Sequence, residues 1–169
     1  MHLGIATIYQ DADLVSSLTV SDNIFLGNER LRGRAFVNSR EQEERTRRLL
    51  QSLSMDMKPS MLVEELSPGQ KQNLQIAKAL HQEARILIMD EPTASLGEEE
   101  TASLMNLVEQ LRKKGLGIIY ISHYLEEMFR LGDMAYVLKD GVMVKRLILK
   151  ETNQDELIKA MVGRDASNF

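Results

Sequence analysis

The sequence predicts an α/β domain built on a parallel sheet, with a helical segment inserted near its N-terminal end. Two observations predict this fold. After residue 66, helical and strand-like segments alternate, and such alternation requires right-handed crossovers between parallel strands. Before it, residues 11–65 carry a mostly helical pattern. The 169 residues, 43% of them hydrophobic, can supply one sizeable core, so we expect one domain or a large part of one.

The N-terminal elements are expected to be one strand followed by two helices. Residues 3–9 form a short apolar stretch typical of a strand. Thr19, followed three residues later by Asp22, resembles a capping box and predicts a short helix that ends at Gly27. A second helix is expected from Ser39 to about residue 54, where charged positions surround a narrow edge of leucines.

Four alternating elements are expected next, namely helices over 68–82 and 98–114 and strands over 86–89 and 118–122. The first of these strands, Ile-Leu-Ile-Met, is apolar throughout, which is typical of burial on both faces of a sheet.

A hairpin and a last helix are expected at the C-terminal end. Strands over 134–138 and 142–149 flank Asp140 and Gly141, a pair that suits a tight turn. Thr152, with an acidic residue three positions later, predicts a helix that ends at Gly163.

Charge and cysteine content argue against several classes of protein. Twenty-one Lys and Arg stand against 25 Asp and Glu, a net charge of -4, which argues against an electrostatic grip on nucleic acid or anionic lipid. Arg45, Arg47 and Arg48 interleave with glutamates, as on a solvated helix face. Because no cysteine is present, disulfides and thiolate metal sites are excluded, and the cytosol is the expected compartment. No leader pattern or apolar run of roughly 18 residues occurs, so we expect a soluble chain.

Residues 66–70, Leu-Ser-Pro-Gly-Gln, predict a well-capped helix start. Ser67 suits the N-cap, Pro68 suits the first helical position, and Gln70 can complete a capping box. The free N–H groups of a helix start, with Gly69 among them, also allow an anion to approach the backbone. Local physics therefore leaves open both a plain helix cap and a phosphate site.

Polar residues follow three of the expected strands. Asp90 and Glu91 end an apolar strand at the edge where open α/β sheets bind ligands, so Asp90 can hold Mg²⁺ and Glu91 can orient an attacking water. His123 ends another strand and can donate to a phosphate oxygen. The amide of Gln10 can reach a metal or a water. Each residue taken alone is also compatible with an ordinary structural role.

Together and in this order, these residues resemble the ATP-binding-cassette (ABC) ATPases. Residues 66–70 are similar to the signature motif Leu-Ser-Gly-Gly-Gln, residues 86–91 to the Walker B strand with its following glutamate, and residues 94–97 to the D-loop. Gln10 is similar to the Q-loop glutamine, and His123 to the switch histidine. The resemblance spans residues 3 to about 164. It implies a P-loop NTPase-like parallel sheet with helices on both faces plus an inserted helical subdomain.

The resemblance also implies a role for each motif. Cassettes of this family form head-to-tail dimers, in which ATP lies between the Walker A loop of one cassette and the signature of the other. Glu91 is implied to polarise the attacking water, and His123 to contact the γ-phosphate. Nucleotide contacts are implied for Gln10, Ser67, Gly69 and Gln70, and Mg²⁺ contacts for Asp90 and Gln10.

The implied organisation has four parts. Residues 1–10 hold the Q-loop strand of the ATPase core, and residues 11–65 form the helical subdomain. Residues 66–150 carry the rest of the core, with the signature helix, Walker B, the D-loop and the switch histidine, and residues 151–169 form a C-terminal helix and the start of a linker.

Three features depart from the family pattern. Pro68 replaces the first glycine of the signature, and Gly97 stands where the D-loop usually ends in Asp. A P-loop requires Gly-x-x-x-x-Gly-Lys followed by Ser or Thr, and no glycine of this sequence is followed by lysine. We therefore expect the fold to be incomplete at the N-terminus, and we expect negligible ATP affinity and hydrolysis for these 169 residues alone.

Within the family, several phrases resemble the first cassette of bacterial carbohydrate importers that carry two cassettes in one polypeptide. They are Ile-Tyr-Gln at 8–10, Asn-Ile-Phe-Leu-Gly at 23–27, Ile-Ala-Lys-Ala-Leu at 76–80, Ile-Ser-His at 121–123 and Met-Val-Gly-Arg at 161–164. This resemblance implies a subunit on the cytoplasmic face of the cell membrane that drives uptake of an aldopentose, a galactoside or a related sugar.

The partners implied are a second cassette, transmembrane permease subunits that meet residues 11–65, and a separate substrate-binding protein, with no nucleic acid. Two alternatives remain. One is a cassette that acts on nucleic acid or the ribosome, which would more often carry long coiled-coil insertions or basic arms. The other is a non-catalytic cassette fragment that only presents its helices to a partner.

Overall fold

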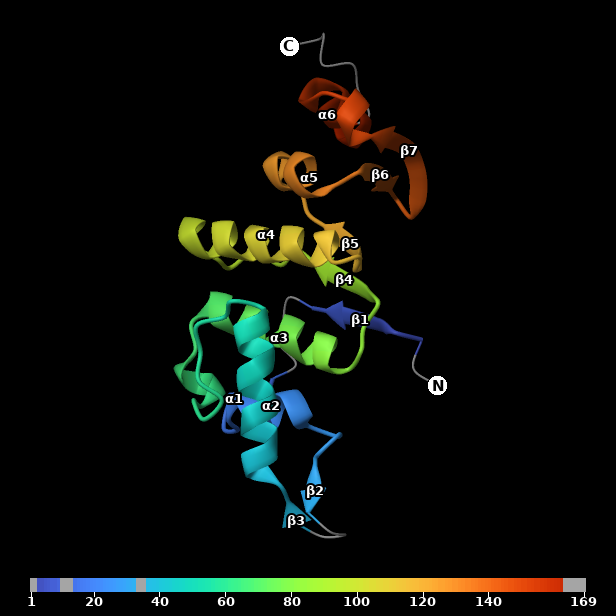
Figure 1. Ribbon diagram of the computed structural model, residues 1–169. Helices are drawn as coiled ribbons and strands as arrows, with labels where there is room; N and C mark the ends of the chain where they lie inside the picture. Colours follow the sequence, from blue (N-terminus) through green and yellow to red (C-terminus); the bar gives the residue numbers. More distant parts are fainter. Residues whose placement is uncertain (1–2, 10–13, 33–35, 163–169) are drawn as a thin grey trace. The chain divides into compact units, whose positions relative to one another are not determined.

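The computed structural model describes residues 3–9, 14–32 and 36–162 (Figure 1). The chain forms two compact units, residues 1–121 and residues 122–169. Within the described residues, no helix is long and apolar enough to cross a membrane.

The first unit is organised around a three-stranded parallel sheet in the order β1-β4-β5. The strands are β1 (Ile5–Ile8), β4 (Ile86–Asp90) and β5 (Gly117–Ile121). Helix α3 (Pro68–His81) leads into β4, and helix α4 (Glu98–Lys113) connects β4 to β5. These elements confirm the predicted alternation of helix and strand and the predicted parallel sheet.

The sheet has one buried face and one exposed face. Right-handed crossovers that run in the same direction across a sheet place their helices on the same side, here α3 and α4. Leu87 and Met89 on the buried face are both 0% exposed, whereas Ile86 on the other face is 38% exposed. The prediction that residues 86–89 are buried on both faces is therefore wrong for one face. We call that side the isoleucine face; it carries Ile5, Ile86, Ile88, Ile119 and Ile121.

In the sequence, two helices and a small hairpin of described residues follow β1 and precede α3 (Figure 1). They are α1 (Val20–Phe25), the antiparallel strands β2 (Leu31–Arg32) and β3 (Phe36–Val37), and α2 (Ser39–Ser52). A short 3₁₀ turn, η1 (Val63–Glu65), follows them. Helices α1 and α2 pack on each other and on α3. The two predicted helices are confirmed, and Thr19 caps α1 by accepting from the Asp22 N–H.

Much of this inserted segment is nevertheless irregular, so the expectation that it is mostly helical is wrong. The connection between α2 and η1 contains Pro59, which cannot donate a helical hydrogen bond. Its carbonyl groups accept hydrogen bonds from the first N–H groups of α1 instead. Val20 N–H donates to the Met61 carbonyl at 2.9 Å, and Ser21 N–H donates to the Pro59 carbonyl at 2.9 Å. The irregular connection therefore provides hydrogen-bond acceptors for the backbone N–H groups at the start of α1.

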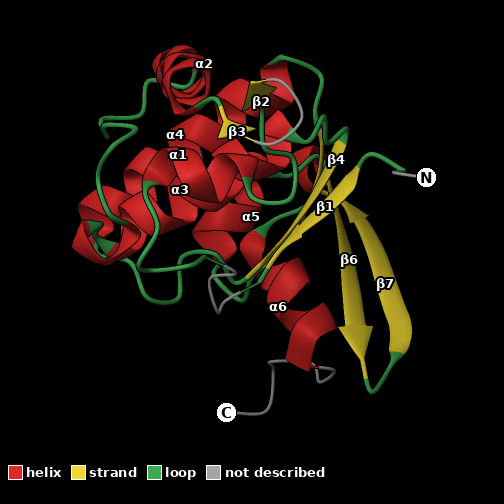
Figure 2. Cartoon of the chain, turned by 90° about the horizontal axis from the view of Figure 1, so that it is seen from below, coloured by secondary structure: helices red, strands yellow, loops and turns green. Residues whose placement is uncertain are grey.

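The second unit contains α5 (Leu125–Leu131), β6 (Met134–Lys139), β7 (Val142–Ile148), the 3₁₀ turn η2 (Leu149–Glu151) and α6 (Gln154–Val162). Strands β6 and β7 form an antiparallel hairpin with α6 packed against both (Figure 2). One core cluster of this unit consists of the buried side chains of Val137, Leu147, Leu149 and Leu157.

Local turn chemistry accounts for the ends of these elements. Asp140 and Gly141 have φ values of 51° and 77°, as a tight hairpin turn requires, which confirms the predicted turn. Asn153 caps α6 by accepting from the Glu156 N–H at 2.9 Å, so the cap lies one residue after the predicted Thr152. The predicted end of this helix at Gly163 lies outside the described residues.

Candidate functional site

The start of α3 forms the capping box that the sequence predicts. Ser67 Oγ accepts from the Gln70 N–H at 3.2 Å, and the Gln70 side-chain oxygen accepts from the Ser67 N–H at 3.0 Å. Pro68 occupies the first turn, where its missing N–H costs nothing. The box leaves the Gly69 N–H and the Ser67 hydroxyl proton available as donors on the same side of the helix start.

These two donors point at one acceptor, the carboxylate of Glu100. Glu100 Oε1 accepts from Ser67 Oγ at 2.6 Å and from the Gly69 N–H at 3.1 Å. Glu100 lies in the first turn of α4. The hydrogen bond from Ser67 holds the pKa of Glu100 below its usual value; desolvation opposes that effect, and backbone hydrogen bonding at Gly69 and Gly97 adds to it.

Glu100 lies directly against Gly69, so a side chain at position 69 would require the Glu100 carboxylate to move. A Cβ atom on Gly69 would lie 2.8 Å from both Cδ and Oε1 of Glu100, closer than van der Waals contact allows. The family motif predicts glycine here, and the structure shows what fills the space beside it. Sequence reasoning missed Glu100, because nothing in a run of three glutamates separates it from Glu98 and Glu99.

Asp90 and Glu91 lie at the carboxyl end of β4, as predicted. Asp90 is exposed. Glu91 has a left-handed backbone conformation with φ of 44°, which residues other than glycine and asparagine rarely adopt. Its N–H donates to the Ile121 carbonyl at 2.9 Å, so the end of β5 holds the strained turn in place. Such strain is a common feature of functional sites. Thr93 in the following turn is buried.

His123 belongs to the second unit, two residues after β5 ends. Its imidazole lies 4.1 Å from the Tyr124 ring, centroid to centroid. The backbone beside it is fixed, because the Tyr124 N–H donates to Ser122 Oγ at 3.0 Å and Ser122 Oγ donates to Glu127 at 2.6 Å.

The structure thus brings together Ser67, Gly69, Gln70 and Glu100, places Asp90 next to Glu91, and describes His123 within the other unit. Gln10 lies outside the described residues.

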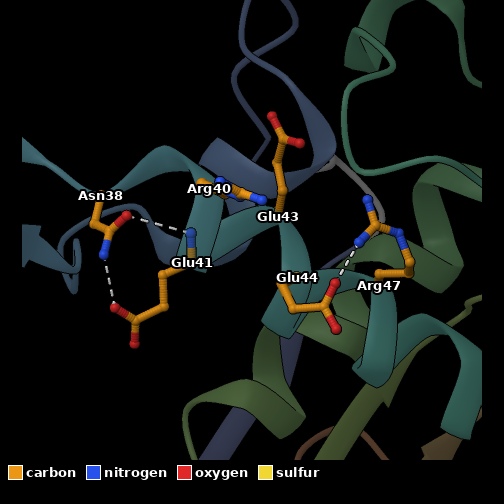
Figure 3. Close-up of a pocket in the computed structure, with 6 residues that line it drawn as sticks. All are labelled: Asn38, Arg40, Glu41, Glu43, Glu44 and Arg47. Carbon is orange, nitrogen blue, oxygen red and sulfur yellow. Dashed lines mark hydrogen bonds and ion pairs between the residues drawn. The ribbon is translucent and has the colours of Figure 1, made fainter.

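A separate surface hollow lies on the exposed side of α2 (Figure 3). Its lining residues are Asn38, Arg40, Glu41, Glu43, Glu44 and Arg47. Several of these charges are already paired, since Glu44 binds Arg47 and Arg48 and Glu41 binds Arg45 at 2.7 Å. This pairing confirms the solvated helix face that the charge pattern predicts, and the hollow shares no residue with the candidate site.

The described residues contain no group of three or more acidic or imidazole side chains that could hold a metal ion by themselves. Asp90 is nevertheless a suitable single ligand, because Mg²⁺ prefers oxygen and is usually held by one or two carboxylates together with phosphates and waters.

Comparison with known proteins decides the family. The model of the ABC transporter family matches residues 1–94, more than half of the chain. This chain belongs to the ABC transporter family. Among its curated relatives, a ribose import ATP-binding protein of Clostridium perfringens is 45% identical over 164 residues, which cover 95% of this chain and 32% of the relative. An L-arabinose transport ATP-binding protein of Geobacillus stearothermophilus is 41% identical, covering 99% of this chain and 33% of the relative. The chain therefore spans about a third of these relatives.

Solved structures agree with this assignment to the ABC family. A subunit of an ABC transporter complex from Clostridium perfringens superposes with a TM-score of 0.73 at 26% identity, over 94% of this chain and 61% of that one. A nucleotide-free ATP-binding cassette from an ABC transporter gives a TM-score of 0.74 at 22% identity, over 95% of this chain and 65% of that one, which shows a shared fold.

Proposed function

We propose that this chain supplies the signature-bearing part of an ATP-hydrolysing subunit in a bacterial ABC importer for a sugar or related small carbohydrate. One observation carries the proposal: the Ser67 hydroxyl and the Gly69 N–H converge on a single anionic oxygen at the start of α3. Two convergent donors at a helix start are what binding of a phosphate oxygen requires. In a member of the ABC family, that phosphate belongs to an ATP held mainly by the partner cassette.

The remaining site residues fit the hydrolytic step. Glu91, held at the end of β4, polarises the attacking water, and His123 donates to the γ-phosphate. Asp90 and Gln10 would hold Mg²⁺, which would neutralise charge on the phosphates. Nucleotide contacts are proposed for Gln10 as well as for Ser67, Gly69 and Gln70. The strained backbone at Glu91 supports this role, because strained conformations are common at functional sites.

The names of the relatives support the proposed cargo. Relatives at 41% and 45% identity are named for arabinose and ribose transport, which supports a pentose or similar sugar as cargo. We propose a peripheral location on the cytoplasmic face of the membrane, with a second cassette, permease subunits and a separate substrate-binding protein as partners. Residues 11–65 would form the subdomain that meets the permease, between the core segments 1–10 and 66–150, and residues 151–169 would lead to a linker.

A chimaera tests the catalytic part of this proposal. This chain would replace the 164 matched residues of the Clostridium perfringens ribose import protein, which keeps its other segments. We expect the chimaera to hydrolyse ATP. Glu91→Gln should lower the rate by at least about 100-fold while ATP binding is kept, because the amide cannot act as a base. Glu98→Gln, an exposed glutamate on α4, is the matched control. Hydrolysis by Glu91→Gln at the unmodified rate would refute the assigned role.

A further inference from the structure

Glu100 occupies the place that the proposed function gives to a nucleotide phosphate. Its carboxylate oxygen lies 2.6 Å from Ser67 Oγ and 3.1 Å from the Gly69 nitrogen, which are ordinary distances for strong charge-assisted hydrogen bonds. The carboxylate also fills the space beside the Gly69 Cα, where even a methyl group would collide with it. A phosphate oxygen cannot use these two donors while Glu100 does.

Two helix starts stabilise the carboxylate in this position. Ser67 and Gly69 belong to the start of α3, and Glu100 itself is in the first turn of α4. A negative charge is favoured at each of these positive dipole ends. Without nucleotide, Glu100 provides an acceptor for the hydroxyl of half-buried Ser67 and for the N–H of buried Gly69. Leaving these two donors without an acceptor would cost free energy.

The contact is also reversible. Glu100 is only partly buried, and its side chain reaches α3 across a sequence separation of 31 to 33 residues. Rotation about its side-chain bonds can carry the carboxylate into solvent while the capping box of Ser67 and Gln70 stays intact, because that box uses different hydrogen bonds. Glu100 can therefore leave without unfolding either helix.

We infer that Glu100 is an autoinhibitory ligand of the signature helix, whose carboxylate holds the phosphate position and must swing away before a nucleotide phosphate binds there. This inference rests on the proposed role of Ser67 and Gly69 in ATP binding. It assigns to Glu100 a regulatory role in that site: Glu100 satisfies the donors in the empty state and opposes binding by direct competition and by charge repulsion.

The test is a titration of MgATP into the chimaera with the ribose import protein, because the 169-residue chain alone is expected to have negligible ATP affinity. Binding at this helix start is followed through the amide resonances of Gly69 and Gln70. Glu100→Gln keeps the shape and removes the charge, and Glu100→Ala removes the side chain beyond Cβ. Both should bind MgATP at this helix start on the order of tenfold more tightly than the unmodified chimaera, since a like charge in contact is removed. Glu99→Gln, on the same turn but exposed, should match the unmodified chimaera.

Each outcome separates the inference from the proposed function. Equal affinities in the unmodified chimaera and both Glu100 variants, with the same resonances shifting, would overturn the inference and leave the phosphate site in place. Weaker binding in the variants would also overturn it, because Glu100 would then assist the nucleotide. If MgATP shifted neither resonance in any variant, the phosphate site of the proposed function would be refuted, and the inference with it.

Discussion

Glu91 combines an unfavourable backbone conformation with the position of a catalytic base. Its φ of 44° is one that glycine adopts freely and that a residue with a Cβ adopts at a cost of roughly 1 kcal/mol or more. We therefore predict that the unfolding free energy of Glu91→Gly exceeds that of Glu91→Ala by about 1 kcal/mol. Denaturant unfolding of the two variants measures this difference.

An exposed helical position provides the control. At Ser103 in α4 the order should reverse, with Gly less stable than Ala by about 1 kcal/mol. If glycine were the less stable residue at both positions, Glu91 would not be strained in solution.

The start of α3 shows which contacts can be predicted from the sequence and which cannot. The capping box of Ser67 and Gln70 is local, so residue types at fixed spacing were enough to predict it. The contact of Glu100 joins two helices that are far apart in the sequence, and no local pattern indicates which of three adjacent glutamates makes it. The roles of Asp90, Glu91 and His123 stay predictions.

Among the elements, we expect the junction of α1 and α3 to be sensitive to pH. His81 at the end of α3 lies 4.3 Å from the Phe25 ring of α1, centroid to centroid. Burial lowers the pKa of His81, the charges of Arg30 and Arg45 lower it further, and Glu83 partly offsets them. The folded chain therefore binds this proton less tightly than the unfolded chain.

The sign of the effect follows from linkage. Well above about pH 6.5 the imidazole is neutral in both states and has no effect on stability. As the pH falls through about 6.5, the unfolded chain takes up the proton first, so folding stability decreases until the folded chain is protonated as well.

We predict that urea unfolding at pH 7.5 and at pH 5.5 differs more for the unmodified chain than for His81→Gln, which cannot titrate. Identical pH dependence in the two proteins would show that His81 is not shielded at this junction.

At the scale of elements, periodicity and turn residues predict most of the fold. The helices at α2, α3 and α4 and the turn at Asp140 were expected because each has a local signal. Helix α5 was missed, although Leu125, Met128 and Phe129 all pack on the core of the second unit. Its seven residues are too few for helical periodicity to stand out in a sequence.

For the molecule as a whole, the isoleucine face is the main exposed apolar surface of the first unit's sheet. Ile5, Ile119 and Ile121 are 51%, 52% and 47% exposed, and β5 pairs with β4 alone among the described strands. An apolar face beside an unpaired strand edge favours association between chains. We predict that the isolated chain self-associates as its concentration rises, and that Ile119→Lys reduces this association.

Sedimentation velocity over a range of concentrations measures the effect, with Ser103→Lys on α4 as a control for the added charge. A chain that stayed monomeric throughout, or association unaffected by Ile119→Lys, would contradict this prediction. The sequence could not predict the exposed face, because an apolar strand such as residues 86–89 has the same pattern whether one face or both are covered.

The central claim is that this chain carries the signature, the acidic strand end and the switch histidine of an ATP site, without a Gly-Lys phosphate loop among its 169 residues. The most direct test is a titration of a labelled ATP analogue with Mg²⁺ into the purified chain and, in parallel, into the chimaera with the ribose import protein. We predict saturable binding at micromolar concentrations for the chimaera and none for the chain alone. Micromolar binding by the chain alone would contradict the account.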